Sequence, residues 1–565
     1  MADTEREVAS LAEDEGDDES VPDGLILGPM LRWVGATEAT VWVETARPGT
    51  VSVLGCSTST FTVRDKHYAL VIVEGLEPGS VTPYDVHLDD RPVWPMPDSE
   101  LPPSVIRTTG RDDDRVSMLV GSCRAAAPHE APYTSEAATD DRGRGVDSLW
   151  AHARRMVDQE PTEWPSAVLL VGDQIYADDS SPNTKERIER RRDSDCDLPP
   201  EIVANFDEYC WLYHEAWSPA LERWLFSVLP TMMIFDDHDV IDDWNISAAW
   251  IAETHEKPWW EPHAVGSVMS YWIYQHLGNL SPDEIRADGM LAELTAVDDA
   301  SERLEQWAGE VNDSDPGDHR FSYFRDVGEI RIVVIDCRHG RVLEADRRLM
   351  VNESEWEWVR DRALEHSGHL VLATTLPVFI SSGLHDLQVW NERVCDGAWG
   401  RRAGRWAESV RRSLDLEDWS AFDRSYTDFV ELLETLYDSG ENPASVVIAS
   451  GDIHFSYTAK VAVGPSDARV HQVVSSPIRN ALIPPERGVM RFTLTGVGRR
   501  IGALLRRLTG ARPNAIPIEM TTGPYFANNM CVLAYDGDHA EVTIEQAVPD
   551  GDGGGVLNEV ARTVL

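Results

Sequence analysis

The chain has 565 residues, of which 42% are hydrophobic and 26% are charged, as in an ordinary globular protein. This length is enough for about two to four domains with sizeable cores, so stability does not require disulfides. The formal net charge of −48, from 98 acidic and 50 basic residues, repels nucleic-acid phosphate and excludes a sequence-independent nucleic-acid binder.

The start of the chain and its cysteines indicate where the protein works. Residues 1–5 lack the basic and apolar regions of a signal peptide, and no apolar run reaches the roughly 20 residues of a membrane helix. Seven cysteines are scattered without a Cys-x-x-Cys pair, which is typical of reduced thiols. We therefore expect a cytoplasmic protein without a transmembrane segment.

The first 110 residues predict an acidic tail followed by an all-β region. Residues 1–23 are rich in Asp and Glu and have little to bury, so we expect a disordered tail. Over residues 24–110, short β-branched runs such as 39–45 and 68–73 alternate with Gly and Pro turns. This pattern predicts a sandwich similar to a fibronectin type III or immunoglobulin-like module.

From residue 115 to 565, short buried strands alternate with helical stretches. Six apolar runs predict the strands 116–120, 167–171, 231–235, 330–335, 369–374 and 445–449. Helical insertions with acidic faces are expected at 185–228, 281–310 and 416–437. This alternation predicts a layered α/β domain, in which ligands bind outside the carboxyl ends of the strands.

Four of these strands are followed directly by side chains that can bind a metal. The segments are Gly121-Ser122-Cys123-Arg124, Gly172-Asp173-Gln174-Ile175-Tyr176, Asp236-Asp237-His238-Asp239 and Gly451-Asp452-Ile453-His454. Each motif alone is weak, because a Gly-Asp after a strand is usually a turn and a lone Cys usually packs as a small hydrophobe. Together they place several carboxylates at buried strand ends, where a cation is the simplest remedy for their charge. The sequence therefore predicts a metal site.

These four motifs resemble those of the PhoD-like (alkaline phosphatase D) branch of the calcineurin-like metallophosphoesterases. The segment Asp336-Cys337-Arg338-His339-Gly340-Arg341 is similar to the Asp-x-Arg-x-x-Arg strand end of that family, and Glu355-Trp356 follows it. The N-terminal sandwich also fits, so the resemblance covers most of residues 24–565. It implies a layered αββα metallophosphoesterase domain over 115–565 that hydrolyses phosphoric esters.

The resemblance also implies a set of metals and ligands. Relatives hold one iron ion (Fe3+) and one or two calcium ions, with other divalent metals as alternatives. The implied iron ligands are Cys123, Tyr176, Asp452 and His454. Asp173 would bridge the iron to calcium, and Asp237 would add a carboxylate, with Asp236 as the less favoured substitute. Thiolate and phenolate suit a ferric ion, whereas ligands with oxygen donors alone suit calcium.

The calcium side departs from the pattern of the family. Family members often carry Asn four residues after the motif His, but this position is Asp242 here. Either Asp242 is the ligand, or the loop is shifted and Asn245 takes its place. We slightly favour Asn245, because Asp-Asp-Trp-Asn forms a coherent variant of the motif.

Three further residues are candidates for catalysis beside the metals. A metal-activated hydroxide would attack phosphorus in line with the leaving group. His238 would protonate the leaving oxygen, and Asp239 would orient His238. Arg124 would clamp a phosphate oxygen, although a salt bridge within the acidic loops is nearly as well supported.

Two other groups of arginines stand out in so acidic a chain. Arg338 and Arg341 could extend the phosphate pocket, but ion pairing with residues 236–243 is the better interpretation for at least one of them. Residues 499–508 predict an amphipathic helix with arginines on its polar face. We expect this helix to pack against the acidic body, with peripheral contact to an anionic lipid surface as the less favoured alternative.

We therefore predict a metal-dependent phosphomonoesterase that acts on phosphorylated small molecules. A phosphodiesterase acting on lipid or nucleotide diesters is the alternative within the same scaffold. The alternative from another class is a non-catalytic, metal-stabilised binding protein. His238 argues against this last alternative, because a purely structural metal site does not need a leaving-group acid.

Overall fold

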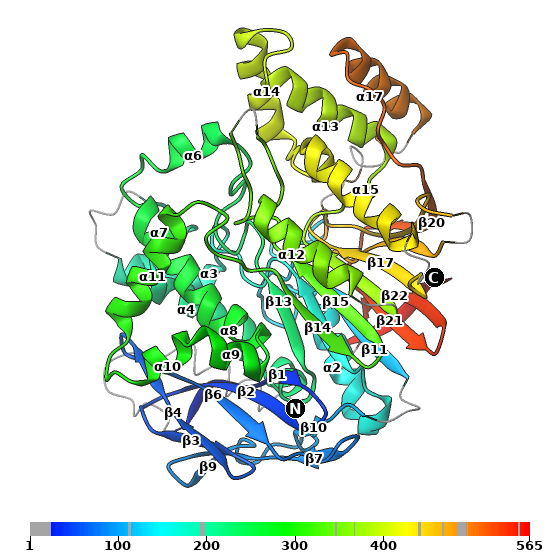
Figure 1. Ribbon diagram of the computed structural model, residues 1–565. Helices are drawn as coiled ribbons and strands as arrows, with labels where there is room; N and C mark the ends of the chain where they lie inside the picture. The colour runs from blue at the N-terminus through cyan, green and yellow to red at the C-terminus, as the bar shows by residue number, and fades with distance from the viewer. Residues whose placement is uncertain are drawn as a thin grey trace.

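The computed structural model extends from an all-β region at one pole, through a central α/β body, to a helical lobe at the opposite pole (Figure 1). It describes residues 24–565 apart from 111–114, 193–197, 345–346, 366–367, 439–441, 466–467, 483–486, 488–492, 494 and 552–553. The acidic tail predicted for residues 1–23 lies outside the described residues, as does the predicted domain boundary between 110 and 115.

The N-terminal region is all-β, as predicted. One sheet has the order β1 (Leu25–Val34), β2 (Glu38–Thr45), β6 (Lys66–Glu74), β5 (Phe61–Val63). The other has the order β4 (Cys56–Ser59), β3 (Thr50–Val53), β8 (Val86–Leu88), β9 (Arg91–Trp94), and β7 (Val81–Pro83) pairs with β10 (Val105–Arg107). Alternating apolar residues of both sheets, such as Val41 and Val53, share one core, because successive side chains on a strand point to opposite faces.

The first sheet of the α/β body carries three of the four strand ends singled out in the sequence. Its order is β13 (Thr231–Ile234), β12 (Ala167–Val171), β11 (Val116–Gly121), β21 (Asn529–Asp536), β22 (His539–Pro549), β23 (Gly555–Val564). Strands β11, β12 and β13 are parallel, so their carboxyl ends meet at one edge. Strand β21 pairs antiparallel with β11.

The second sheet carries the fourth strand end. Its order is β14 (Tyr323–Val327), β15 (Ile330–Ile335), β16 (His369–Thr374), β17 (Ser445–Ser450), β19 (Val470–Val474), β18 (Ser456–Val461), β20 (Ile518–Tyr525). Ile332 and Val371 share an apolar core with β11 and β12 of the first sheet. Val333 and Leu372, on the opposite face, pack with residues of helices α12 (Glu353–Leu364) and α15 (Asp423–Asp438).

Helices cover the outer faces of the two sheets. The N-terminal half has α2 (Ser148–Val157), η1 (Pro161–Glu163), α3 (Pro182–Arg191), α4 (Phe206–Trp217), α5 (Ala220–Val228), α6 (Ala248–Thr254) and α7 (Trp260–Ser270). The π-helix η2 (Tyr271–His276) is followed by α8 (Leu277–Asn279), α9 (Pro282–Asp288), α10 (Met290–Thr295) and α11 (Ser301–Asp313). The C-terminal half has α12 (Glu353–Leu364), α13 (Ser382–Cys395), α14 (Arg401–Ser413), η3 (Trp419–Ala421), α15 (Asp423–Asp438) and α17 (Gly496–Leu508).

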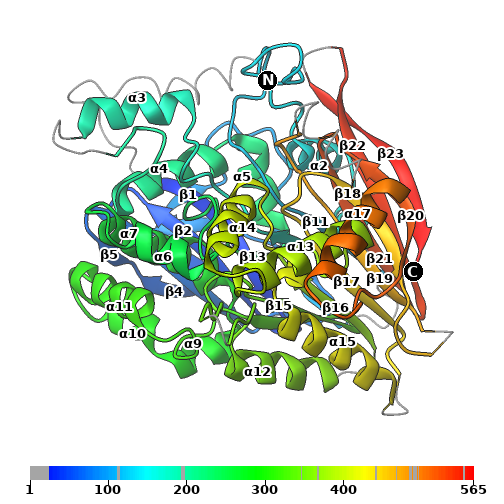
Figure 2. The same cartoon turned by 90° about the horizontal axis from the view of Figure 1, so that it is seen from above.

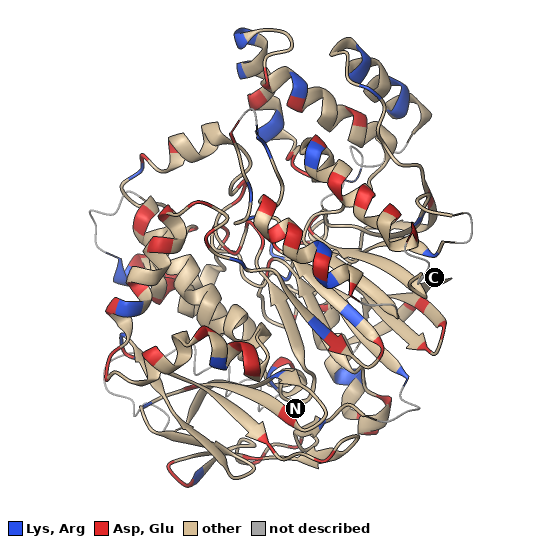
Figure 3. Ribbon diagram, viewed as in Figure 1, with Lys and Arg blue, Asp and Glu red and all other residues tan. Residues whose placement is uncertain are grey.

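The layers therefore follow the order helix, sheet, sheet, helix that the resemblance implies. Helix α2 packs on the outer face of the first sheet, and α12 and α15 lie along the second (Figures 1 and 2). Acidic side chains occur over most of the drawn elements, whereas basic side chains gather on α14 and α17 (Figure 3). Among the described residues, no helix has both the length and the hydropathy needed to cross a bilayer.

Candidate metal centre

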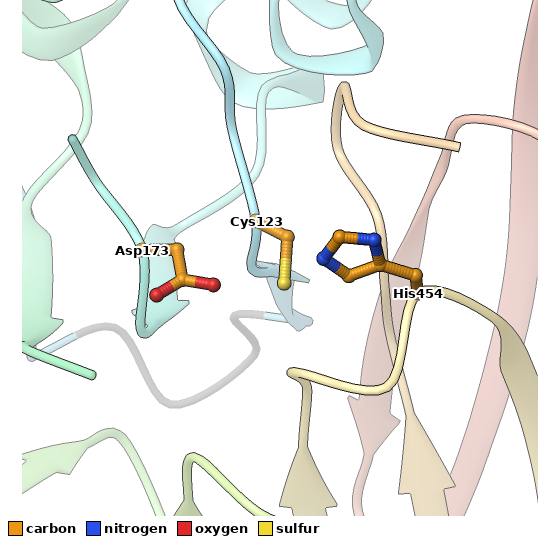
Figure 4. A group of neighbouring side chains, drawn as sticks. All are labelled: Cys123, Asp173 and His454. Carbon is orange, nitrogen blue, oxygen red and sulfur yellow. The ribbon is translucent and has the colours of Figure 1, made fainter. Parts of the chain in front are cut away.

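Two groups of potential ligands lie where the strand ends of the two sheets meet. The ligand atoms of Cys123, Asp173 and His454 all lie within 4.8 Å of one another (Figure 4). The same limit holds for a second group made of Asp173, Asp236, Asp237 and Asp452. Because Asp173 belongs to both groups, its carboxylate is in position to bridge two cations.

Several of these side chains are held by a rare backbone conformation. Cys123, Asp173, Asp452 and His454 have φ angles of 55°, 52°, 64° and 54°. Residues other than glycine seldom adopt positive φ, and such strained positions gather at functional sites. Hydrogen bonds fix two of them, since the Cys123 N–H donates to the Gly172 carbonyl (3.3 Å) and the Arg124 N–H to the Asp173 carbonyl (3.0 Å).

Gly172 allows the second carboxylate group to form. Its φ angle is 100°, and a Cβ atom at this position would lie 2.7 Å from the Cβ of Asp236. Only glycine therefore fits where the end of β12 passes the end of β13. This close approach brings Asp173 and Asp236 into one group.

Burial shifts the pKa values of the side chains in and beside these ligand groups. Burial, together with neighbouring carboxylates, raises the pKa of Asp173 and Asp452 well above the ordinary range. Burial also raises the pKa of the Cys123 thiol and of the Tyr176 phenol. Burial lowers the pKa of His454 to about 4, which keeps its ring neutral and able to bind a metal.

The buried oxygen atoms of this site fit a bound cation. Within the described part of the chain, both carboxylate oxygens of Asp173 and the Oδ2 atom of Asp236 are buried without a hydrogen-bond partner. Such atoms are costly unless something satisfies them. A metal ion satisfies all three, and the nearby sulfur and imidazole donors suit a transition metal. The donor set therefore fits the metals implied by the resemblance.

Tyr176 lies beside this group. Its ring lies 4.6 Å from that of His238, and its hydroxyl oxygen accepts a hydrogen bond from the Asn480 side chain (3.0 Å). Ser476 donates to the Cys123 sulfur (3.2 Å) from the same loop. Asn480 and Ser476 follow β19, a strand that is not among those predicted from the sequence, so neither residue was a candidate.

Arg338 supplies one positive charge from the protein itself. Its guanidinium is fully buried, is bonded to Asp236, and lies 3.1 Å from Asp237 and 2.6 Å from Glu417. Arg338 thereby holds the pKa of Asp237 below its ordinary range, against the effect of burial. The predicted ion pairing with residues 236–243 is thus observed for Arg338, whereas Arg341 pairs with Glu417 (2.8 Å). No signal in the sequence pointed to Glu417.

The partner of His238 differs from the one expected. Asp178 lies 2.9 Å from the His238 Nδ1 atom, and it raises the pKa of His238 well above its ordinary value although burial alone would lower it. Asp239 instead turns inward and accepts hydrogen bonds from the backbone N–H groups of Asp173 and Asp236, both at 2.9 Å. Asp239 therefore ties two strand ends together, and Asp178 is the residue that orients His238.

Arg124 is committed to other partners. Its buried guanidinium pairs with Asp147 (2.8 Å) and Glu222 (2.7 Å) and donates to the Ala216 carbonyl (2.6 Å). With these donors engaged, the expected phosphate clamp is not formed, and the alternative of a salt bridge is the one observed. His129, Asp147 and Glu222 also lie close together, but Arg124 already supplies their counter-charge.

Asp242 and Asn245 lie outside both ligand groups. The Asn245 side chain donates to the Arg338 carbonyl (3.2 Å) and lines a cavity of about 660 Å³, together with Trp244 and His339. None of the candidate ligands that lie within 4.8 Å of one another lines this cavity. Asp242 is exposed, and its N–H donates to Asp178 (2.6 Å), so it lies at the rim beside His238. Which of Asp242 and Asn245 is a ligand stays a prediction, and the contact of Asp242 with Asp178 beside His238 supports Asp242.

Comparisons with known proteins agree with this architecture. A solved structure described as "Structure of PhoD" matches with a TM-score of 0.58 and 11% sequence identity, over 97% of this chain and 91% of that one. Residues 22–106 match a family model described as a domain of unknown function (DUF7800). A search among curated proteins finds no match. The structural match confirms the predicted fold, a β-region followed by a layered α/β body like that of the PhoD structure.

Proposed function

We propose that this protein is a metal-dependent phosphoric ester hydrolase, an alkaline phosphatase D-like phosphomonoesterase. The observation that carries the proposal is the pair of ligand groups that share Asp173 at the meeting point of four strand ends. The fold of the matched PhoD structure supports it. His238 adds the proton donor that a structural metal site would not need.

Each ligand group has a role in this proposal. Cys123, Tyr176, Asp452 and His454 would hold an iron ion. Asp173 would be shared with a second cation, calcium or another divalent metal, which Asp237 and Asp242 would help to hold. When bound, these metals supply the positive charge that activates a water molecule and neutralises the phosphate oxygens.

The residues around the metals prepare the leaving-group step. Asp178 accepts a hydrogen bond from His238 Nδ1, which leaves Nε2 free to donate a proton to the leaving oxygen. The ring of Tyr176 packs against the His238 ring and limits its rotation. Asp239 accepts hydrogen bonds from the backbone of Asp173 and Asp236, and so fixes the positions of the two ligand loops relative to each other.

The proposal is tested by hydrolysis of an aryl phosphate monoester in the presence of iron and calcium. We expect Asp173→Asn to lower kcat at least about a hundredfold, because it removes the shared ligand while leaving the fold. The matched control is Asp326→Asn, which removes an exposed carboxylate of β14 that pairs with Arg331. Wild-type turnover by a folded Asp173→Asn variant would overturn the proposal.

The same assay with an aryl phosphate diester separates the alternatives. A preference for the monoester supports the phosphomonoesterase. A preference for the diester, still abolished by Asp173→Asn, would identify a phosphodiesterase at the same site. If neither substrate is hydrolysed above the Asp173→Asn blank, the non-catalytic metal-binding protein is the correct interpretation.

A further inference from the structure

The helical lobe at the far pole has the opposite charge to the rest of the molecule. We define the basic lobe as residues 393–412 and 496–512, which include most of α14 and all of α17. It contains eleven arginines and two acidic residues, a net charge of +9, so the remainder of the chain carries −57. Several of the basic segments drawn in Figure 3 lie together at this end of the molecule.

An apolar stripe runs along the exposed side of α17. Val497, Ile501, Leu504 and Leu508 are 56%, 45%, 58% and 58% exposed. Their spacing of four, three and four residues places them on one side of the helix. Two tryptophans of the same lobe, Trp399 and Trp406, are 41% and 55% exposed. Large apolar side chains gathered in this way on a surface mark an interaction site.

The stripe is not used to attach α17 to the body. The helix packs on α13 through its small residues, since a Cβ atom on Gly502 would lie 2.5 Å from the Gly383 carbonyl oxygen. Arg506 adds an ion pair with Asp386 of α13 (2.6 Å). Helix α17 therefore packs on the body as expected, but through its glycine face, and its apolar stripe remains exposed.

The two helices of the lobe pack into one unit. The Trp399 indole donates to the Leu508 carbonyl (3.3 Å), which joins the start of α14 to the end of α17. Leu505 packs on a small core that contains Trp390 and Ala407. The exposed tryptophans and the apolar stripe are thus presented by a single packed unit.

We propose that the basic lobe binds peripherally to an anionic lipid bilayer. The apolar stripe of α17 enters the boundary between headgroups and acyl chains, and the tryptophans lie at the interface, where indole rings are favoured. Arg500 and Arg507, which flank the stripe, contact the lipid phosphates. Within the described part of the chain, no carboxylate forms an ion pair with these two arginines.

Charge argues for a membrane over a second copy of the chain. A two-fold contact through this surface would bring the arginines of both copies together, which is repulsive. An anionic bilayer is complementary to the lobe and repels the strongly acidic remainder, so it also fixes the orientation of the bound protein. This inference does not depend on the proposed esterase activity.

Vesicle flotation with the full chain tests the inference. Vesicles contain either phosphatidylcholine alone or equal parts of phosphatidylcholine and phosphatidylglycerol. We expect binding to the anionic vesicles only, weakened by added salt. Leu504→Asp should lower the partition coefficient about tenfold or more, because it replaces a leucine that the bilayer would bury with a charged side chain. The matched control is Val297→Asp, at an apolar position outside the lobe that is 48% exposed.

The alternatives give different results. Equal binding of Leu504→Asp and wild type would overturn the inference, as would the absence of binding to anionic vesicles. Self-association that Leu504→Asp abolishes, without any vesicle binding, would identify a second copy as the partner and overturn the lipid assignment. Trp406→Ser repeats the test if Leu504→Asp changes the melting temperature, and its binding is expected to fall in the same way.

Discussion

Three properties meet at Asp173. Its carboxylate belongs to both ligand groups, its two oxygens are buried without a hydrogen-bond partner among the described residues, and its φ angle is 52°. Each of these is costly for a folded protein without a ligand. A cation shared between the two groups accounts for all three together.

The contact between Asp178 and His238 leads to a prediction about leaving groups. Asp178→Asn should leave His238 poorly oriented and weaken its ability to donate a proton. We expect kcat to fall at least about tenfold for an alkyl phosphate, whose leaving oxygen needs a proton, and little for an aryl phosphate with an acidic leaving group. The measurement is the ratio of the two rates.

The neighbouring residue supplies the control for this experiment. Asp179→Asn removes the same charge one position along the chain, at an exposed side chain, and should leave the ratio of the two rates unchanged. An equal loss for both substrates in Asp178→Asn would argue that Asp178 only stabilises the loop.

At the scale of single residues, the sequence predicted the candidate metal ligands better than the hydrogen-bond partners of the residues around them. Cys123, Asp173 and His454 could be predicted because each follows a buried strand, and the parallel strands fix where their ends lie. The partner of His238 could not, because the directions of neighbouring side chains in an irregular turn are set by φ and ψ. Asp239 turns into the core, and Asp178, sixty positions before His238, occupies the expected place.

At the scale of elements, the loop after β15 places the positively charged guanidinium of Arg338 among the carboxylates of the site. Arg338→Met should lower the free energy of unfolding of the metal-free protein by about 3–5 kcal/mol, because it leaves buried carboxylates without a partner. Added metal should restore part of this loss, since cations neutralise the same carboxylates. Denaturant unfolding with and without metal measures both effects.

An exposed arginine serves as the comparison. Arg562→Met removes a surface ion pair with Glu559 and should change the free energy of unfolding by at most about 1 kcal/mol. If Arg338→Met were no more destabilising than Arg562→Met, Arg338 would not be the resident counter-charge of the site.

The predicted strands of the body include several that are buried on both faces. All five residues of β12 and all six of β16 are buried, so they form apolar runs that stand out in the sequence. Among the C-terminal strands that were missed, β19 is fully buried, but His471 and Gln472 interrupt its apolar run. Strands β20 and β23 were missed because they carry many exposed residues. In β20 and β23, buried or partly buried positions are interspersed with exposed ones, and no apolar run marks them.

At the scale of the whole molecule, a series of hydrogen bonds connects the sandwich to the site. The buried Arg32 of β1 donates to the carbonyls of Tyr274 and Gln275 in the π-helix η2, both at 2.7 Å. The Gln275 side chain donates to Asp239 (3.1 Å), which holds the backbone of Asp173. The sandwich thus supports the ligand loops, a role that composition and periodicity do not reveal.

Buried histidines should make the molecule sensitive to acid. Burial lowers the pKa of His152 and His276 to about 3 and that of His263 to about 4. Below about pH 6.5 the unfolded chain therefore binds protons that the folded protein does not. Their contribution to stability is complete above this pH and is lost as the pH falls toward 3.

His276→Gln tests this behaviour through the melting temperature measured between about pH 5 and 6.5. We expect the stability of the variant to fall less steeply as the pH is lowered. Glutamine does not titrate, so unfolding of the variant takes up as much as one proton fewer than unfolding of the wild type. His539→Gln, at a side chain that is 53% exposed, is the control and should keep the wild-type slope. An unchanged slope in His276→Gln would contradict the account.

The metal content of the reconstituted protein tests the central claim most directly. Iron and calcium are supplied, excess metal is removed, and bound metal is measured by elemental analysis in wild type, Cys123→Ser and the buried control Cys531→Ser. We expect iron and a thiolate absorption band in wild type and Cys531→Ser, and loss of both in Cys123→Ser. Iron retained at the wild-type level in Cys123→Ser, or absent from wild type, would contradict the assignment of this site.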